Sequence, residues 1–295
     1  MLLCCMKTIK DAVLSFKKQL NDLYGPQEAE AIVMLVLQEL TGMSRAKIKA
    51  FEDDELPSET ADKLPQILQE LSTGRPVQYI LGSTEFYGLP FLVNAATLIP
   101  RPETEELVAW ILESQKLKVQ DQRPLRILDI GTGTGCIAIT LSKNTTNAYV
   151  SAIDISPEAL RTAERNAIIN EAKVDFHNVD ILDKNSYQAI NNSYDIIVSN
   201  PPYVTPADKL RMHANVTDFE PHTALFVPEE DPLKFYIAIA DFANTQLDKD
   251  GLLFFEINEA FGKETSEMLI AKGFDKIELR QDMSGRDRMI KAIKA

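Results

Sequence analysis

The chain has 295 residues, with 45% hydrophobic and 25% charged side chains, which is the balance of an ordinary soluble globular protein. Its length is comfortable for two domains. The net charge of -13 argues against a broad basic surface of the kind with which duplex-binding proteins neutralise phosphates. Composition therefore disfavours a nucleic-acid partner, although a local basic patch would remain compatible with it.

The thiols and the apolar runs indicate the compartment. The sequence contains only three cysteines: Cys4, Cys5 and Cys136. So few thiols, without zinc-ligand spacing, favour a reducing compartment. The longest apolar run, residues 31–37, is far below the roughly 20 residues that span a bilayer, and the start lacks the features of a secretion signal. We expect a cytoplasmic protein with no membrane and no metal site, whose true start is Met1 or Met6.

Residues 7–73 have the pattern of a small helical bundle. Apolar positions recur at helical spacing, and the Gly-Pro pair at residues 25–26 ends the first helix. Further helices are expected over residues 26–40, 44–51 and 58–71. Pro65 is expected to interrupt the last of them. We assign residues 1–75 to a helical domain, which carries no catalytic signature of its own.

The character of the sequence changes after residue 76. Residues 77–81, 85–87 and 91–93 are rich in β-branched and aromatic side chains and are flanked by glycine and proline. We expect residues 76–97 to form a β-hairpin linker between two domains.

From residue 98 to 295, strand-like and helix-like segments alternate. Strands are expected over residues 125–130, 149–155, 174–179, 194–199, 252–257, 276–279 and 288–292. Such alternation predicts an α/β domain with a mostly parallel sheet covered on both faces. Ligands of such sheets bind at the carboxyl ends of the strands.

Residues 127–135, Ile-Leu-Asp-Ile-Gly-Thr-Gly-Thr-Gly, predict a buried strand that runs into a glycine-rich turn. The pattern resembles the dinucleotide-binding fingerprint and the first motif of class I methyltransferases, but the G-x-G-x-G spacing and the preceding acid favour the second. A carboxylate there would repel a pyrophosphate but could receive the ammonium group of S-adenosylmethionine, directly or through water. The candidate cofactor residues here are Asp129, Gly131, Thr132, Gly133, Thr134 and Gly135.

Asp154 ends the next expected strand, 23 residues after Gly131, which is about the spacing of the ribose-binding acid in dinucleotide sites. A carboxylate there can accept hydrogen bonds from both hydroxyls of a ribose. It could instead cap the following helix, but Ser156 is the better capping residue. We therefore expect Asp154 to bind the cofactor.

The tetrapeptide Asn200-Pro201-Pro202-Tyr203 directly follows the expected strand 194–199. An amide or ring-conjugated amino nitrogen is a poor nucleophile because its lone pair is delocalised. The Asn200 side-chain oxygen and the Pro201 carbonyl can accept its two N–H bonds and aim the lone pair at a methyl group. The prolines fix the direction of the backbone, and Tyr203 offers a flat face for stacking. We expect all four residues to be catalytic and Asn200 to contact the cofactor as well.

With these motifs, the chain resembles the HemK/PrmC family of protein-(glutamine-N5) methyltransferases, which act on class-one peptide-chain release factors. Residues 98–105, Leu-Ile-Pro-Arg-Pro-Glu-Thr-Glu, and 219–225, Phe-Glu-Pro-His-Thr-Ala-Leu, extend the resemblance over nearly the whole chain. It implies a seven-stranded class I, Rossmann-like methyltransferase domain behind a helical substrate-recognition domain. It also implies S-adenosyl-L-methionine as cofactor, class-one release factors as partners, and a substrate loop of Arg101, Pro102 and Glu103.

Two positions depart from the family pattern. Asp180, the acid at the end of the third strand, is followed by Ile181, where the family often has an aromatic residue. Both are expected in the cofactor site, with Ile181 as an apolar wall for adenine. Asn258 stands two residues after Glu256, where glycine is frequent. Because asparagine tolerates positive φ better than other non-glycine residues, we expect that turn to survive.

The expected reaction is direct in-line methyl transfer to a glutamine side chain, accelerated mostly by orientation. An adenine-N6 methyltransferase acting on nucleic acid is the first alternative, because adenine also presents two N–H bonds on a conjugated plane. A non-catalytic cofactor-binding interaction module is the second. The paired acceptors of the tetrapeptide argue against that module, since binding alone does not require them.

Overall fold

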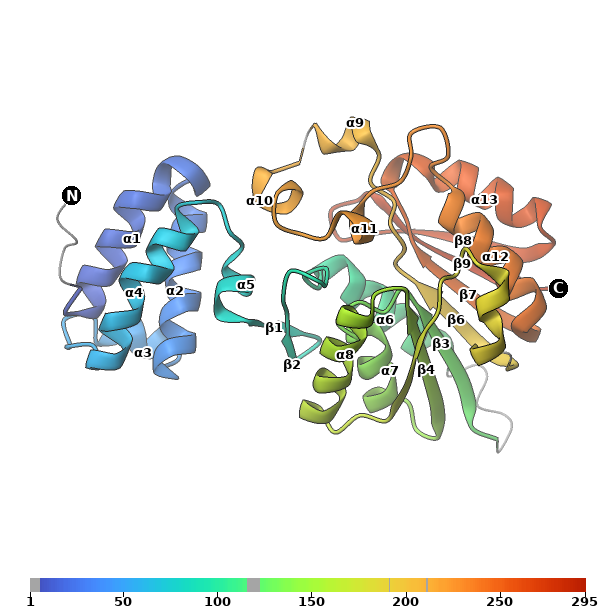
Figure 1. The fold of residues 1–295 in the computed structure, drawn as a ribbon, viewed down its shortest axis with the longest axis horizontal. Coiled ribbons are helices and arrows are strands. Elements are labelled where there is room, and N and C mark those ends of the chain that lie inside the picture. Colours follow the sequence, from blue (N-terminus) through green and yellow to red (C-terminus); the bar gives the residue numbers. More distant parts are fainter. Residues whose placement is uncertain (1–5, 116–122, 191, 211) are drawn as a thin grey trace. The chain divides into compact units, whose positions relative to one another are not determined.

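The computed structural model describes residues 6–115, 123–190, 192–210 and 212–295, so that Met1, Cys4 and Cys5 lie outside the described residues. The chain separates into two compact units (Figure 1). The first comprises Met1–Gly82 with His213–Phe219, and the second comprises Ser83–Met212 with Glu220–Ala295. No helix in the described part of the chain is long and apolar enough to cross a bilayer.

The first unit is helical. Its helices are α1 (Ile9–Tyr24), α2 (Pro26–Thr41), α3 (Arg45–Ala50), α4 (Ser58–Leu71), α5 (Val77–Leu81) and α10 (Ala214–Thr217). Thr8 and Asp11 form a reciprocal capping box at the start of α1, which satisfies two free backbone N–H groups. Phe16, Leu20 and Leu37 are fully buried in the core between these helices. The unit is therefore held by the apolar faces that the sequence pattern indicates.

The helix α4 runs without a break through Pro65, so the predicted interruption was wrong. A proline inside a helix costs about 3 kcal/mol because it removes one backbone hydrogen bond. However, Leu64, Leu68 and Leu71 of the same helix are buried in the core. Their packing on both sides of the proline outweighs the lost bond and keeps the helix continuous.

The predicted β-structure at residues 77–81 was also wrong, because this segment is the helix α5. Pro76 precedes the helix with φ -55°, which suits a helical entry, and Gly82 ends it in the left-handed conformation with φ 77°. A strand would need a pairing partner. In the described part of the chain no strand pairs with residues 77–81, and the two strands that follow form a two-stranded sheet of their own.

The second unit begins with the predicted hairpin, β1 (Ser83–Phe86) and β2 (Leu89–Leu92), which pair in antiparallel register. Tyr87 and Gly88 form its two-residue turn with φ 52° and 73°. Positive φ at both positions matches the right-handed twist of hairpin strands.

The rest of the second unit is built on one seven-stranded sheet. Its strands are β3 (Leu125–Ile130), β4 (Ala148–Asp154), β5 (Val174–Asn178), β6 (Tyr194–Ser199), β7 (Leu247–Glu256), β8 (Phe274–Gln281) and β9 (Asp287–Lys294). They lie in the order β5-β4-β3-β6-β7-β9-β8. The strands β3 to β7 are parallel, and β9 is antiparallel to both neighbours. This arrangement confirms the predicted class I, Rossmann-like sheet.

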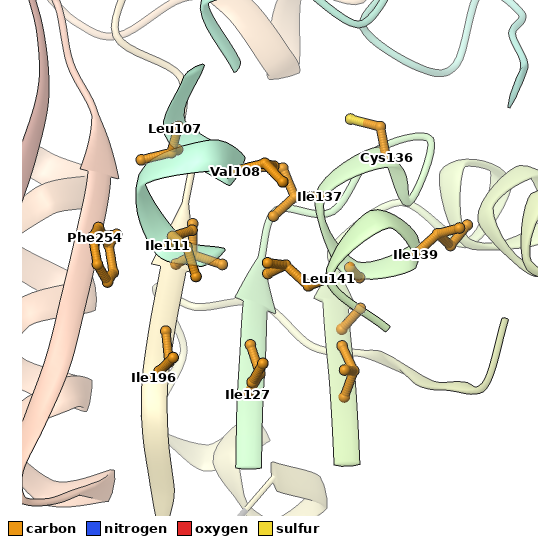
Figure 2. Packing of buried hydrophobic residues seen from close by; sticks show 14 of the residues in the cluster. Leu107, Val108, Ile111, Ile127, Cys136, Ile137, Ile139, Leu141, Ile196 and Phe254 are labelled. Carbon is orange, nitrogen blue, oxygen red and sulfur yellow. The ribbon is translucent and has the colours of Figure 1, made fainter. Parts of the chain in front are cut away.

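Helices cover both faces of the sheet. The covering helices are α6 (Pro102–Gln115), α7 (Cys136–Asn144), α8 (Pro157–Ile169), α12 (Lys234–Gln246) and α13 (Gly262–Ala271). The second unit also contains the short helices α9 (Pro206–Lys209) and α11 (His222–Leu225) and the 3-10 helices η1 (Lys184–Ile190) and η2 (Glu259–Phe261). On one face, Leu107 and Ile111 of α6 pack with Ile127 of β3 (Figure 2). On the other, Leu128 packs with α12 residues. Alternate side chains of β3 are thus buried on opposite faces.

Candidate active site

Two neighbouring cavities lie in the second unit, where the carboxyl ends of β3, β4 and β6 meet. The larger has a volume of about 380 Å³ and is lined by the glycine-rich loop, the end of β4 and the start of the tetrapeptide. The smaller has a volume of about 340 Å³. Both are lined by Leu98, Arg101, Asn200, Pro201 and Ala224. The first half of the tetrapeptide therefore lies where the two cavities meet.

The glycine-rich loop forms one wall of the larger cavity through residues 131–134. Gly131 and Gly133 have φ of 74° and 56°, and a Cβ atom on either would meet no atom within 4 Å. Gly135 does not line the cavity. A Cβ there would lie 2.9 Å from the Ile139 side chain and 3.1 Å from Ala163 Cβ, so this glycine serves the packing of α7 against α8.

Asp154 lines the same cavity from the end of β4. Its Oδ2 accepts a hydrogen bond from Gly133 N at 2.9 Å, and its Oδ1 accepts one from Ser156 N at 2.9 Å. Ser156 caps α8 through its own hydroxyl, as expected. Each carboxylate oxygen can accept a second bond, so Asp154 retains capacity for a diol. Burial raises the pKa of Asp154.

Asp129 is fully buried and is not part of the cavity lining. Its Oδ2 accepts hydrogen bonds from Thr132 Oγ1 at 2.7 Å and Ala138 N at 3.3 Å. Its Oδ1 has no hydrogen-bond partner among the described residues. Burial raises the pKa of this carboxyl to about 7. A nearby positive charge would stabilise the ionised form of this carboxyl group. The Asp129 side chain, however, is buried and does not line the cavity.

The segment that directly follows β5 contributes a mostly apolar wall to the larger cavity. Val179, Asp180, Ile181 and Leu182 line the larger cavity after β5. Asp180 Oδ1 accepts a hydrogen bond from Leu182 N at 2.8 Å, and the Ile181 carbonyl accepts one from Tyr187 Oη at 2.6 Å. These two bonds fix the segment, and the Ile181 side chain is buried among apolar neighbours.

The tetrapeptide is divided between the cavities. Asn200 and Pro201 line both, Pro202 lines the larger and Tyr203 lines the smaller. Asn200 Nδ2 donates to Thr104 Oγ1 at 3.2 Å. Tyr203 Oη donates to Glu256 Oε1 at 3.0 Å, and burial raises the pKa of this phenol well above its ordinary value.

Of the expected substrate loop, Arg101 lines both cavities, whereas Pro102 and Glu103 line neither. Arg101 Nη2 lies 2.5 Å from Oε1 of the buried Glu220, whose other oxygen accepts from Ile99 N at 3.2 Å. Pro102 is exposed at the start of α6, and Glu103 is half-buried. The segments around residues 101 and 220 are therefore joined by an ion pair and a backbone-to-carboxylate hydrogen bond.

Asn258 has φ -67° and ψ 131°, so the turn that we expected to survive does not depend on a positive φ at this residue. Its side-chain oxygen caps η2 by accepting from Ala260 N at 2.9 Å. Its Nδ2 donates to the Tyr203 carbonyl at 3.1 Å and to Asp208 Oδ2 at 2.8 Å. The asparagine side chain thus fixes, through two hydrogen bonds, the segment that follows the tetrapeptide, and a glycine has no side chain to make them.

Sequence reasoning did not identify Thr104 and Glu256 as site residues. Thr104 Oγ1 donates to Glu256 Oε2 at 2.6 Å, and both side chains are buried. The available signal was a single acid in the otherwise apolar run Leu-Leu-Phe-Phe-Glu-Ile at residues 252–257. Buried acids are rare unless they are paired or hydrogen-bonded.

Comparisons with known proteins agree with this geometry. A family model described as PrmC N-terminal domain matches residues 11–82, and one described as Methyltransferase small domain matches residues 112–217. The release factor glutamine methyltransferase of Flavobacterium psychrophilum is 45% identical over 96% of this chain and 98% of that protein. The Bacteroides thetaiotaomicron protein of the same name is 43% identical over 94% of this chain and 96% of that protein. The chain belongs to the release factor glutamine methyltransferase family.

Membership of this family establishes which reaction the chain catalyses. It is an S-adenosylmethionine-dependent protein-(glutamine-N5) methyltransferase. A methyltransferase from Pyrococcus furiosus of known structure has the same fold, with a TM-score of 0.50 and 17% identity over 80% of this chain and 99% of that one. Family membership decides against the adenine-N6 enzyme and against the non-catalytic module.

Proposed function

We propose that this methyltransferase modifies one glutamine side chain in class-one peptide-chain release factors, and that Asn200 and Pro201 orient the glutamine nitrogen. The substrate is supported by the names of the relatives that match nearly the full chain. The roles are supported by one observation, that both residues line both cavities. The larger cavity then takes the cofactor, and the smaller takes the glutamine.

The residues around the larger cavity fit S-adenosylmethionine. Gly131 and Gly133 leave open space where a side chain would otherwise stand, and the carboxylate of Asp154 suits a ribose diol. Ile181 provides an apolar surface for adenine. The unpartnered oxygen of Asp129 suits the ammonium group through water, since this side chain is outside the cavity wall. When bound, the cofactor supplies a methyl group that its sulfonium makes electrophilic.

At the smaller cavity, the chain orients the acceptor. The Asn200 side-chain oxygen and the Pro201 carbonyl each accept one N–H of the glutamine amide, which draws the nitrogen lone pair out of conjugation. Pro201 and Pro202 restrict the backbone so that the carbonyl keeps one direction. The ring of Tyr203, held by its bond to Glu256, gives the amide plane a fixed surface. Holding reactants in one geometry is the main source of acceleration here.

We also propose distinct roles for the two parts of the chain. Residues 1–75 form a domain that docks the release factor, residues 76–97 form the linker, and residues 98–295 hold the cofactor and the acceptor. The match of residues 11–82 to a separate family domain supports this division. A release-factor substrate also supports a cytoplasmic location.

The variant Asn200→Ala tests the central role. We expect it to lose most of its turnover while its cofactor affinity stays within about threefold, because the amide mainly orients the acceptor in the transition state and is only one of many residues that line the cofactor cavity. Single-turnover methylation and calorimetry measure the two quantities. The control Asn244→Ala removes a partly buried amide of α12 outside both cavity walls and should keep its activity. Near wild-type turnover in Asn200→Ala would remove this side chain from the mechanism.

A further inference from the structure

The side-chain amide of Asn200 has two chemically opposite ends. Its oxygen accepts hydrogen bonds, whereas its NH2 group only donates them. In the proposed function, on which this inference rests, the oxygen must face the acceptor nitrogen. If the amide were rotated by half a turn, an N–H would meet the N–H bonds of the substrate, and the acceptor could not be oriented.

One neighbour determines which end of this amide faces which way. Asn200 Nδ2 lies 3.2 Å from Thr104 Oγ1, and Thr104 Oγ1 lies 2.6 Å from Glu256 Oε2. A hydroxyl has a single proton to donate. When that proton is bound to the carboxylate, the Thr104 oxygen can only accept, so Asn200 must present its NH2 group to it. The oxygen of the amide is thereby turned away from Thr104.

The carboxylate that starts this chain of hydrogen bonds is well fixed. Glu256 is 1% exposed and ends β7, whereas Thr104 is 3% exposed and lies in α6. The second oxygen of Glu256 accepts from Tyr203 Oη at 3.0 Å. Burial raises the pKa of Glu256, and the hydrogen bonds from Thr104 and Tyr203 and the Arg288 charge oppose that rise. The two distances place both hydroxyls as donors, one to each oxygen of the Glu256 side chain.

We propose that Glu256, acting through Thr104, is a positioning residue that fixes the Asn200 amide with its oxygen toward the acceptor nitrogen. The same carboxylate fixes the phenol of Tyr203, so one buried acid orients two residues of the tetrapeptide. Neither Glu256 nor Thr104 exchanges a proton with the substrate in this account. Their contribution is to the geometry of the transition state and therefore to kcat.

The test compares Thr104→Val, Thr104→Ser and Glu256→Gln in the full-length enzyme with a release factor as substrate. Valine has the shape of threonine without its hydroxyl, and serine keeps the hydroxyl. Glutamine offers one acceptor oxygen where glutamate offers two, so Thr104 or Tyr203 must reverse its hydrogen bond. Because Thr104 also lines the larger cavity, kcat is measured at saturating cofactor, and the cofactor Kd is measured for each variant.

We expect kcat of Thr104→Val and Glu256→Gln to fall roughly 10- to 100-fold, the size of effect that a misplacement of about 1 Å produces. The KM for the release factor and the cofactor Kd should stay within about threefold. Thr104→Ser should recover kcat to within about threefold of wild type. The control Thr265→Val removes a fully buried hydroxyl with no hydrogen-bond partner among the described residues and should leave kcat unchanged.

Two results would overturn the inference while leaving the proposed function intact. One is a near wild-type kcat in Thr104→Val or Glu256→Gln when Asn200→Ala has lost its turnover. The other is a Thr104→Ser variant as slow as Thr104→Val, which would mean that the position acts through packing. If Thr104→Val fails to bind cofactor, Glu256→Gln alone decides, by the same criterion. Retention of turnover in Asn200→Ala would instead refute the proposed function.

Discussion

Asp154 combines a place in the wall of the larger cavity with a carboxylate whose two oxygens each accept one backbone N–H. These bonds fix the side chain and leave acceptor capacity for a ribose. We predict that Asp154→Ala loses charge-assisted bonds of about 1.5–3 kcal/mol, which is roughly a 10- to 150-fold weaker cofactor affinity. Calorimetry measures the cofactor affinity. The control is Asp175→Ala, which removes an exposed carboxylate on β5. Equal affinities in wild type and Asp154→Ala would refute the assignment.

The buried carboxyl group of Asp129 leads to a second prediction at the residue scale, which concerns how the free energy of unfolding depends on pH. Its pKa is raised from 3.8 to about 7 by burial, so the folded protein binds this proton more tightly than the unfolded chain does. The stability that it contributes is present below pH 3.8 and is lost as the pH rises through 7. Without cofactor, the free energy of unfolding should fall by about 2–3 kcal/mol more between pH 5 and 8 in wild type than in Asp129→Asn. Urea unfolding at each pH measures this difference, and identical pH profiles for wild type and Asp129→Asn would contradict the prediction.

Sequence reasoning located some of these residues and missed others for a physical reason. Asp154 ends the strand β4 and Asn200 directly follows the strand β6, and the carboxyl ends of parallel strands meet at one edge of the sheet. Their cavity positions could therefore be predicted, whereas their roles stay predictions. Thr104 and Glu256 touch across 152 positions of sequence. Only the way in which α6 packs against β7 brings them together, and no local pattern encodes that.

At the scale of elements, the sheet could be predicted more securely than the short helices. The strands β3 and β6 begin and end at the predicted residues, because apolar runs of this length fit a sheet that is buried on both faces. The five residues of α5 carry too few positions to show a helical period. Their β-branched and aromatic composition favoured a strand, whereas Pro76 before the segment and Gly82 after it frame a single helical turn.

The helical unit supplies the prediction at this scale. Removing residues 1–73 should weaken methylation of an intact release factor more than methylation of a short glutamine peptide, because only the former could dock on that domain. Initial rates on both substrates measure the difference. Calorimetry of cofactor binding provides the control, since the residues that line the larger cavity all belong to the second unit. Equal losses on both substrates would mean that the helices serve stability alone.

At the scale of the whole molecule, net charge distinguishes between the two acceptors that suit the tetrapeptide, a glutamine side chain and an adenine in nucleic acid. The chain has 44 acidic and 31 basic residues, so it has little general attraction for phosphates. An enzyme making 6–10 phosphate contacts on duplex DNA would lose about 10³–10⁵ in affinity between 50 and 200 mM salt. It would also spend a few kcal/mol to extrude its base. A glutamine on an exposed loop requires neither.

The most direct measurement incubates the enzyme with labelled S-adenosylmethionine and, in parallel, with a class-one release factor, duplex DNA or total RNA. Mass spectrometry of the release factor then locates the added methyl group. We predict one methyl group on a glutamine side chain of the release factor and no labelling of nucleic acid above background at any salt concentration. Salt-sensitive labelling of nucleic acid, with an unmodified release factor, would contradict the account.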